Sequence, residues 1–388
     1  MTDTWNNTAK RIVRGLTFLV MLATLAMVEA GCTNHHSGPF VRKNALWVGS
    51  NVTTGFYSEF TKLPHLGIEP DPTVFNLSPA LLLPRGIIFD KSNNLWGTNC
   101  EGPTSDGSIT KFTSDQLRHL FTVTNPDPNV FIQDQGDGVT LDCPKGLAFL
   151  KGNLYVASSG STDGFPAIVE FSKDQLRVTG PSTPDPYTYF VPKTFNFGEL
   201  GQLQFDKKDN LWVTDLNNRV VYGWKFSALD SIAGKGGSAS SPLRLDPDFT
   251  VRWNAFNFLD GLAFSPSGNM WLTDHANNQL YAFTPDQIIS NIPNQTPTII
   301  INPVPITTPS GTTDSLVTPT WLSIQSNGYL WVTNSHSDNF GSVAGYDASQ
   351  LKVSGSPIPE QFFDSNPTGG NFQHPVTLTF GLSIRQSF

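Results

Sequence analysis

A short phrase built on Leu-Trp recurs six times along this chain and restricts the available folds more than any other feature. Its copies begin 49 to 60 residues apart, at Leu46-Trp47, Leu95-Trp96, Leu154-Tyr155, Leu211-Trp212, Met270-Trp271 and Leu330-Trp331. Each copy continues as a short apolar run and ends in a small polar residue, such as Asp215 or Asp274. Self-similarity at a regular period of this kind predicts a repeat architecture.

Each repeat contains several short strand-like runs. About eleven residues before the Leu-Trp phrase lies another apolar run, such as 84–89 or 260–264, and turn-forming residues separate the two. Two such runs predict a β-hairpin. A third run, such as 167–171, and a less regular fourth run, such as 298–301, complete the unit. Because the apolar residues show no helical period, we predict four antiparallel strands per unit, which make one blade of a β-propeller.

The two ends of the repeat region complement each other. Leu46-Trp47 has no preceding inner strand, whereas 374–380 resembles an inner strand that no Leu-Trp phrase follows. If the C-terminal strand joins the first blade, the ring closes and leaves no open sheet edge. The sequence therefore predicts an all-β fold, a six-bladed β-propeller of four-stranded antiparallel blades, over residues 44–388.

The N-terminal segment has the features of an export signal. Lys10, Arg11 and Arg14 precede an apolar stretch at 15–28, which is too short for an ordinary membrane span. We assign residues 1–31 to a signal peptide and 32–43 to a tether, so we expect a periplasmic, cell-surface lipoprotein or secreted protein. Cys32 is a candidate for lipidation, although Glu29 stands where a lipoprotein signal normally has Leu. That lipid would be the chain's only membrane contact.

The charge of the chain narrows the range of partners. The formal net charge is −8, whereas sequence-independent nucleic-acid binding needs a basic surface. We therefore expect no nucleic-acid partner, and we expect a monomer.

The cadence Pro-x-Gly-Leu-Ala-Phe, followed by Asn-Leu-Trp-Val-Thr-Asp, resembles that of NHL-repeat and gluconolactonase-like six-bladed propellers. The resemblance covers roughly residues 44 to 380. More distant resemblances are to streptogramin lyase and to the propeller lyase that forms peptide amides. Since this fold supports many activities, the resemblance implies the architecture and leaves the function open.

Comparing equivalent positions between blades separates framework from candidate site. In an up-and-down blade, the end of the Leu-Trp strand and the start of the inner strand share one rim. Short polar residues that end the Leu-Trp strand most often bond to the backbone of the adjoining turn. The positions beside the first residue of the inner strand vary more, and Arg85 and Lys145 among them could hold an anionic ligand.

Two cysteines fall on this rim in adjacent blades. Cys100 follows the Leu-Trp strand of blade 2, and Cys143 precedes the inner strand of blade 3. In an oxidising compartment these two thiols are candidates for a disulfide, which would leave Cys32 unpaired. A pair of free buried thiols is the alternative.

Three histidines fall on the same rim. His275, His336 and His374 belong to consecutive blades of the closed ring, and converging imidazoles are what a zinc ion needs. Such a site would resemble the zinc centre of the peptide-amidating lyase. Two other interpretations stay open: separate rim histidines, and a catalytic histidine without metal.

The resemblance to gluconolactonase-like propellers implies a second possible ion, calcium, bound by oxygen ligands in the channel. The oxygen-bearing side chains available on the rim are Glu199, Asp215, Asp260, Asn99 and Glu101. The sequence does not decide between calcium, zinc and no cofactor.

Two classes of function follow. We favour an exported scaffold that binds a small molecule, glycan or protein on the channel rim. The alternative is a metal-dependent lyase or hydrolase, lactonase-like or streptogramin-lyase-like, with candidate catalytic residues His275, His336, His374 and Arg85.

Overall fold

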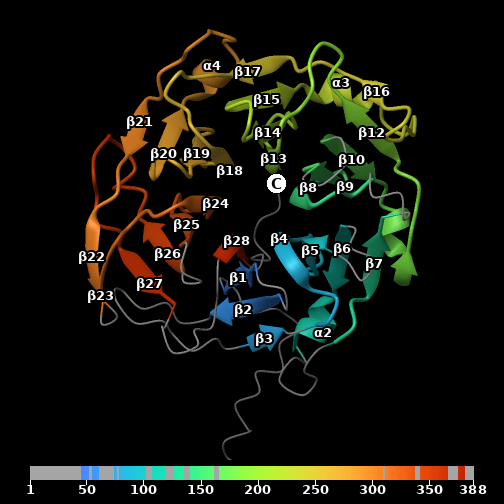
Figure 1. Cartoon of the computed structure of the whole chain (residues 1–388), viewed down its shortest axis with the longest axis horizontal. Helices are drawn as coiled ribbons and strands as arrows, with labels where there is room; N and C mark the ends of the chain where they lie inside the picture. Colours follow the sequence, from blue (N-terminus) through green and yellow to red (C-terminus); the bar gives the residue numbers. More distant parts are fainter. Residues whose placement is uncertain are drawn as a thin grey trace, which may run out of the picture. The chain divides into compact units, whose positions relative to one another are not determined.

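The chain folds into six radial β-sheets around a common axis, as the computed structural model shows (Figure 1). The structure describes residues 45–51, 55–60, 74–76, 78–101, 107–118, 126–134, 140–160, 166–308, 311–336, 341–365 and 375–380, all within the compact unit Val41–Phe388. The predicted all-β six-bladed propeller is thus confirmed. The expected signal peptide and tether, with Cys32, lie outside the described residues, and so does His374. Among the helices in the described ranges, none has the length and apolar character needed to span a bilayer.

The first three blades hold the N-terminal half of the repeat region and the C-terminal strand. Blade 1 contains, from the axis outward, β28 (Pro375–Phe380), β1 (Leu46–Ser50), β2 (Phe56–Phe60) and β3 (Val74–Asn76). Blade 2 contains β4 (Leu82–Phe89), β5 (Leu95–Glu101), β6 (Ser108–Phe112), β7 (Val130–Gln133) and β11 (Gly180–Ser182). Blade 3 contains β8 (Pro144–Leu150), β9 (Asn153–Ser158), β10 (Ala167–Phe171), β12 (Thr188–Val191) and β16 (Leu243–Arg244).

The other three blades are four-stranded. Blade 4 contains β13 (Leu200–Phe205), β14 (Leu211–Asp215), β15 (Val220–Trp224) and β17 (Phe249–Val251). Blade 5 contains β18 (Leu259–Phe264), β19 (Met270–Asp274), β20 (Gln279–Phe283) and β21 (Ile299–Ile301). Blade 6 contains β24 (Pro319–Ile324), β25 (Leu330–Ser335), β26 (Gly341–Tyr346) and β27 (Gln361–Asp364). Outside the blades, the described residues form a hairpin and four short helices: β22 (Pro305–Thr308), β23 (Gly311–Asp314), α2 (Ser114–Arg118), η1 (Gln175–Arg177), α3 (Phe226–Asp230) and α4 (Pro285–Ile288).

The C-terminal strand closes the ring as the sequence predicts. β28 pairs antiparallel with β1, and Leu46 lies opposite Phe380 while Val48 lies opposite Leu378. This pairing gives blade 1 its inner strand, so β1 has a hydrogen-bonded neighbour on both sides.

The Leu-Trp phrase forms the core between blades. The aromatic residue of the phrase meets the Phe that ends the inner strand of the next blade at ring-centroid distances of 5.1 to 6.3 Å. The pairs are Trp47–Phe89, Trp96–Phe149, Tyr155–Phe205, Trp212–Phe264 and Trp331–Phe380. The last pair joins blade 6 to blade 1 and thereby repeats the framework contact across the closure. The repeated aromatic residue belongs to the framework, because it packs between neighbouring blades.

The structure adds strands that the sequence did not predict. β11 and β16 belong to connections of blades 3 and 4, yet they pair in parallel with the outer strands β7 and β12 of the preceding blades. Gly355 makes the same kind of parallel bridge to Ile301 in β21. Each of these connections reaches back to cover the outer edge of its neighbour, which protects an edge strand.

A recurring glutamine stabilises the loop that follows the third strand of the blade. In four blades its carboxamide oxygen accepts a backbone N–H three residues earlier, and its NH₂ group donates to a backbone carbonyl eight to eleven residues later. The residues are Gln116, Gln175, Gln287 and Gln350. This glutamine, which stands between a polar residue and Leu or Ile in all four sequences, therefore fixes the conformation of the loop.

Candidate functional site

A β-bulge lies near the start of the inner strand in every blade. At these points the inner strand carries one more residue than its partner, and the register shifts. The residues that follow the first position of the bulge are Arg85, Lys145, Gly201, Asp260, Thr320 and Val376. Bulges often re-aim side chains next to functional sites. The variable position singled out in the sequence is therefore the bulged position.

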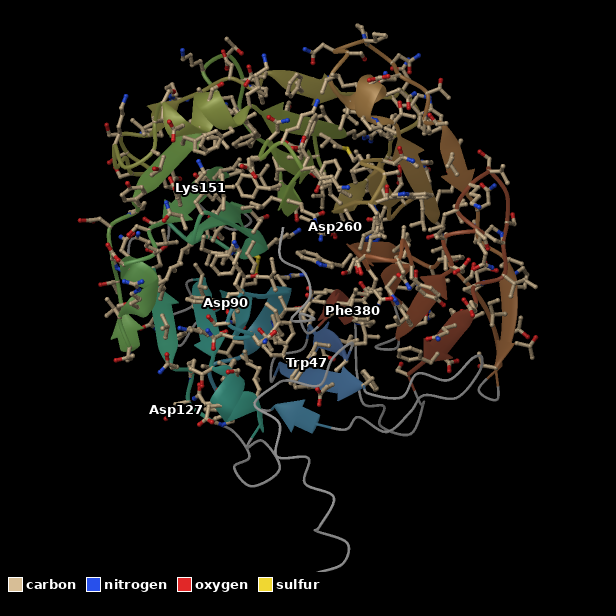
Figure 2. All side chains as sticks on the ribbon, turned by 180° about the vertical axis from the view of Figure 1, so that it is seen from behind. Trp47, Asp90, Asp127, Lys151, Asp260 and Phe380 are labelled. Carbon is tan, nitrogen blue, oxygen red and sulfur yellow. A yellow bond between two sulfur atoms is a disulfide. The ribbon has the colours of Figure 1, made fainter. Side chains whose placement is uncertain are left out.

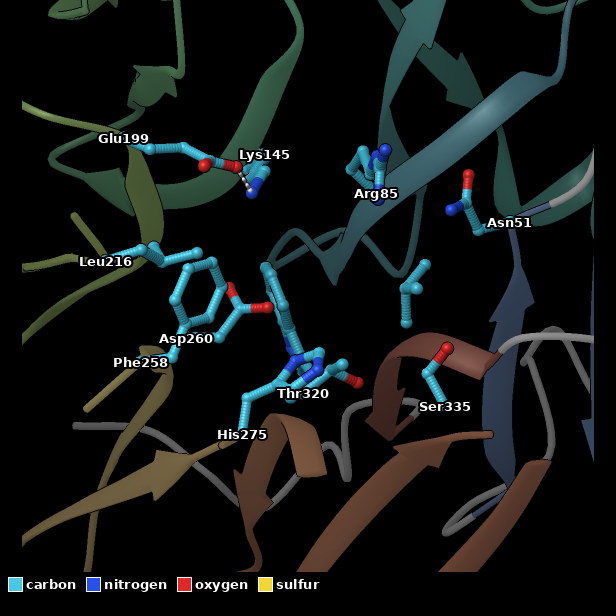
Figure 3. A pocket seen from close by; sticks show the side chains of 12 residues that line it. Asn51, Arg85, Lys145, Glu199, Leu216, Phe258, Asp260, His275, Thr320 and Ser335 are labelled. Atoms are coloured by element: carbon cyan, nitrogen blue, oxygen red, sulfur yellow. Dashed lines mark hydrogen bonds and ion pairs between the residues drawn. The ribbon is translucent and has the colours of Figure 1, made fainter. Parts of the chain in front are cut away.

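The bulged residues surround a cavity at this rim. The cavity measures about 210 Å³, and residues of all six blades line it: Asn51, Arg85, Lys145, Glu199, Leu216, Phe258, Asp260, His275, Thr320, Trp321, Ser335 and Val376. Figure 3 shows Asp260 and His275 on one side of this space and Arg85 on the opposite side. Asp260 also lies at the inner end of its blade, whereas Asp127 lies at the perimeter (Figure 2). We call this space the mouth cavity.

Two side chains from the inner strands contact blades that do not adjoin their own. The carboxamide of Gln202 in blade 4 accepts from the backbone N–H of Leu262 at 2.9 Å and of Leu322 at 3.2 Å, and it donates to the Leu322 carbonyl at 3.0 Å. These partners belong to blades 5 and 6. Trp321 of blade 6 places its Cη2 atom 3.1 Å from where a Cβ on Gly86 of blade 2 would stand. Glycine is needed there, since a Cβ would also meet the Lys145 carbonyl.

We expect Gln202→Leu to lower the free energy of unfolding by about 2–3 kcal/mol, because buried backbone N–H groups of two other blades would lose their acceptor. Urea unfolding of the variant and the parent protein measures this loss. Gln204→Leu is the matched control; it removes one bond, to the Phe264 N–H, at a half-buried position, and should cost about 1 kcal/mol or less. Equal losses in both variants would contradict a bridging role for Gln202.

Charged groups of both signs meet in the mouth cavity. The Lys145 ammonium donates to a Glu199 carboxylate oxygen at 2.5 Å, joining blades 3 and 4 (Figure 3). Burial raises the pKa of Asp260 above the ordinary value of an aspartate; the Lys145, His275 and Arg85 charges oppose this shift, and Glu199 adds to it. A carboxyl group with a raised pKa in a cavity is typical of a functional site.

The three candidate histidines have different surroundings. His275 lines the mouth cavity, its ring lies 5.4 Å from that of Phe258, and its buried Nδ1 atom has no hydrogen-bond partner among the described residues. His336 does not line the cavity; its Nε2 lies 3.4 Å from the Ser342 hydroxyl. His374 lies outside the described residues. The prediction of a three-histidine zinc site therefore stays untested.

The small polar residues that end the Leu-Trp strands bond to nearby turns. The Asp215 carboxylate accepts from the N–H groups of Gly198 and Asn218 and from the Asn218 amide. Asn99 donates to Ser108, and the Asp274 carboxylate accepts four comparable bonds. Burial raises the pKa of Asp215, and these hydrogen bonds oppose the shift.

The oxygen ligands proposed for calcium are dispersed. Glu199 and Asp260 line the mouth cavity, Asp215 and Asn99 do not, and the side chain of Glu101 is not described. In the described part of the chain, no three His, Cys, Asp or Glu side chains are grouped to hold a metal ion. Glu199 is bound to Lys145, and Arg85 adds a second cation, so the described carboxylates do not suit a divalent ion.

Cys100 and Cys143 form a disulfide, the pairing expected from the repeat. The bond joins the end of β5 to the residue before β8, and so links blades 2 and 3 beside the bulge that carries Lys145.

Replacing both cysteines, as Cys100→Ser and Cys143→Ser together, should lower the free energy of unfolding by about 2–4 kcal/mol, since the bond closes a loop of 43 residues in the unfolded chain. Guanidinium unfolding with and without reductant measures the effect. Reductant should lower the midpoint of the parent protein and leave that of the double variant unchanged. A parent midpoint that does not respond to reductant would contradict the prediction.

Sequence comparison between blades missed Trp321, the aromatic wall of the mouth cavity. A signal existed, because the second bulge position holds glycine in three blades (Gly86, Gly146 and Gly261) and a large side chain in Trp321 and Gln202. Glycine at this position in three blades leaves room near the axis, which indicates that the large side chains at the same position in two other blades cross toward it.

No protein-family model and no curated protein matches the sequence. Solved structures match the fold: a protein of unknown function from Bacteroides caccae has 12% identity and a TM-score of 0.53, with 88% of this chain and 100% of that one covered. The periplasmic gluconolactonase of Pseudomonas aeruginosa has 13% identity and a TM-score of 0.49, covering 87% and 99%. A streptogramin B lyase has 12% identity and a TM-score of 0.40, covering 77% and 90%. The structural neighbours thus include gluconolactonase-like and streptogramin lyase propellers, and likeness at this level of identity shows the fold alone.

Proposed function

We propose that this protein is an exported propeller that binds a small polar molecule in the mouth cavity. The observation that carries the proposal is the convergence of side chains from all six blades, among them Arg85, Asp260 and His275, on one space of about 210 Å³. Ligand sites are concave, with apolar walls and a few polar groups that orient the ligand. The volume favours a small molecule over the glycan or protein partners also considered.

A blocking substitution tests this proposal. Ser335→Trp places an indole at a half-buried position of the cavity wall, whereas Ser349→Trp adds the same side chain at an exposed position of the same blade. A library of small polar molecules is screened by thermal shift. We expect compounds that raise the melting temperature of the parent and of Ser349→Trp but not of Ser335→Trp. Stabilisation that persists in Ser335→Trp would overturn the proposal.

Hydrolysis of a small ester or lactone is the second candidate function. One observation favours it: a carboxyl group of raised pKa, Asp260, lies within electrostatic reach of the His275 imidazole in the same cavity. A carboxyl and an imidazole are the usual general acids and bases. Lactone hydrolysis is also the activity named for the Pseudomonas aeruginosa neighbour.

Activity measurements distinguish binding from turnover. The purified protein is assayed with small lactones by acid release, and its metal content is measured to test the zinc and calcium predictions. Turnover that His275→Ala abolishes would support the hydrolase, and turnover that survives in Ser335→Trp would place it outside the mouth cavity.

Export and its destination, periplasm, cell surface or medium, are part of the proposal. The basic and apolar segments at 10–28 support export. Mass spectrometry of the mature N-terminus tests it. A chain that begins at Cys32 without a lipid indicates ordinary cleavage, a lipid on Cys32 indicates a lipoprotein, and an intact N-terminus overturns export.

A further inference from the structure

The bulged residues of the inner strands lie outside the regular pairing of their own sheets. In blade 5 the register shifts between Leu259 and Leu262, so Asp260 and Gly261 have no residue opposite them in β19. A bulge leaves such residues unheld by the ladder, and their buried backbone groups need other partners. The direction of the Asp260 side chain therefore depends on contacts from outside its own sheet.

A threonine of the preceding blade makes this contact in three places. Each threonine stands one residue before the polar end of its Leu-Trp strand, has no exposed surface, and donates its hydroxyl hydrogen to the carbonyl of a bulged residue in the next blade. The pairs are Thr98 and Lys145 at 2.8 Å, Thr214 and Asp260 at 2.6 Å, and Thr273 and Thr320 at 3.0 Å. All three bulged residues line the mouth cavity with polar side chains (Figure 3).

Two blades without a crossing threonine precede a bulged residue that has no polar side chain. Blade 3 has Ala157 at the threonine position, and the bulged residue of blade 4 is Gly201. Blade 6 has Thr333, whose hydroxyl bonds within its own blade, and the bulged residue of blade 1 is Val376. Blade 1 is the exception, since it has glycine at this position although the bulged residue of blade 2 is charged. The crossing hydroxyls thus accompany polar side chains in the cavity.

Blade 4 contacts Asp260 at a second point. A Cβ atom on Gly201 would stand 2.8 Å from an Asp260 carboxylate oxygen and 2.6 Å from the Thr214 hydroxyl oxygen. Any side chain at position 201 would therefore displace the carboxyl group or the hydroxyl that holds its backbone. Glycine here leaves the space that the Asp260 carboxyl occupies.

We propose that Thr214 and Gly201 are positioning residues of the mouth cavity, which together hold the Asp260 carboxyl group in it. The Thr214 hydroxyl fixes the bulged backbone, and Gly201 leaves room for the carboxyl group beside it. Thr98 and Thr273 act in the same way on the bulges of blades 3 and 6. The importance of this positioning for a ligand rests on the proposed function, whereas the positioning itself is testable without a ligand.

Removal of the Thr214 hydroxyl tests the proposal. Unfolding midpoints are measured from pH 3.5 to 8 for the parent, Asp260→Asn, Thr214→Val and the double variant. Burial raises the pKa of Asp260, Glu199 adds to the shift, and the Lys145, His275 and Arg85 charges oppose it. The parent and Asp260→Asn curves should therefore separate as pH rises. Without the hydroxyl the carboxyl group is no longer held in its buried position, so the separation at the alkaline end should fall to about half or less, a coupling that a double-mutant cycle detects.

Two further variants distinguish positioning from a general loss of stability. Thr110→Val removes another buried hydroxyl, which donates to the Gly97 carbonyl away from the mouth cavity, and it should leave the separation unchanged. Thr214→Ser keeps a hydroxyl and should retain the separation, and Thr214→Ala takes the place of Thr214→Val if the valine variant does not unfold cooperatively.

Three results would overturn the positioning role: an unchanged separation in Thr214→Val, an equal reduction in Thr110→Val, or no separation between the parent and Asp260→Asn. None of these measurements uses a ligand. The library screen with Ser335→Trp therefore remains an independent test, and the proposed function can stand or fall separately from the positioning of Asp260.

Discussion

Leu378→Ala in the closing strand should lower the free energy of unfolding by about 2–5 kcal/mol, the range for truncating a large buried aliphatic side chain. Leu378 is 1% exposed and packs in one cluster with Leu46, Val48 and Trp331. The cluster therefore joins the last strand to the first blade and to blade 6. A cavity there weakens the closure of the ring as well as local packing. Guanidinium unfolding measured by fluorescence and by circular dichroism gives the loss.

The matched control for ring closure lies one residue away. Thr379→Ala removes a half-buried side chain from the same strand, and its effect should stay below about 1 kcal/mol. A chain that ends before Pro375 lacks β28 altogether, so blade 1 would lose its inner strand, and we expect no cooperative unfolding transition. If the shortened chain unfolds cooperatively with the parent midpoint, the C-terminal strand does not close the ring.

Asp260→Asn should make the free energy of unfolding less sensitive to pH than that of the parent protein. Burial raises the pKa of Asp260 in the folded protein, with Glu199 adding to the shift and Lys145, His275 and Arg85 opposing it. A raised folded pKa contributes stability that is present below the unfolded pKa of about 3.9 and is lost as pH rises through the folded pKa. The parent should therefore lose stability relative to Asp260→Asn over that window.

Measurement of unfolding midpoints from pH 3.5 to 8 tests the sign of this effect. The two curves should meet at the acid end and separate as pH rises, with Asp260→Asn the more stable protein. Asp286→Asn is a suitable control, because Asp286 is exposed in α4 on the perimeter. Curves that separate toward acid instead would show that the pKa of Asp260 is lowered.

The sequence predicts the framework of this molecule well because the framework repeats. The Leu-Trp phrase recurs in every blade, and five of its six copies make the same aromatic contact with the following blade, as Trp47 does with Phe89. The closing strand was predictable for a related reason, since a ring leaves complementary parts at its two ends. Cys100 and Cys143 were paired by related reasoning, because the end of the Leu-Trp strand and the start of the inner strand lie on the same rim in adjacent blades.

The site was only partly predictable, because it depends on how the bulges aim non-equivalent residues. Sequence comparison found the rim and its variable positions, including Arg85, Glu199 and Asp260. It proposed Asp215 and Asp260 equally as candidate metal ligands. In the structure, Asp215 is hydrogen-bonded to turns and Asp260 lines the cavity. Both are aspartates at inner-rim positions, and only the local backbone distinguishes them.

Contacts that cross the axis could be predicted only in part from the repeat. Gln202 bonds to blades 5 and 6, and Trp321 reaches Gly86 in blade 2. Gln202, Trp321 and Gly86 all hold the second bulge position, so comparison between blades marks this position but does not show which blade each side chain reaches. The parallel strands β11 and β16 were not predicted either, because short Gly- and Pro-containing connections do not show the alternating pattern of a strand.

The central claim is that the mouth cavity is the ligand site, and a crystallographic fragment screen tests it most directly. Crystals of the protein are soaked with a set of small carboxylates, amides and amines that includes benzoate. We predict fragment density in the mouth cavity, in contact with its polar side chains and with the Trp321 and Phe258 rings. Fragments that cluster on another surface and leave the mouth cavity empty would contradict the account.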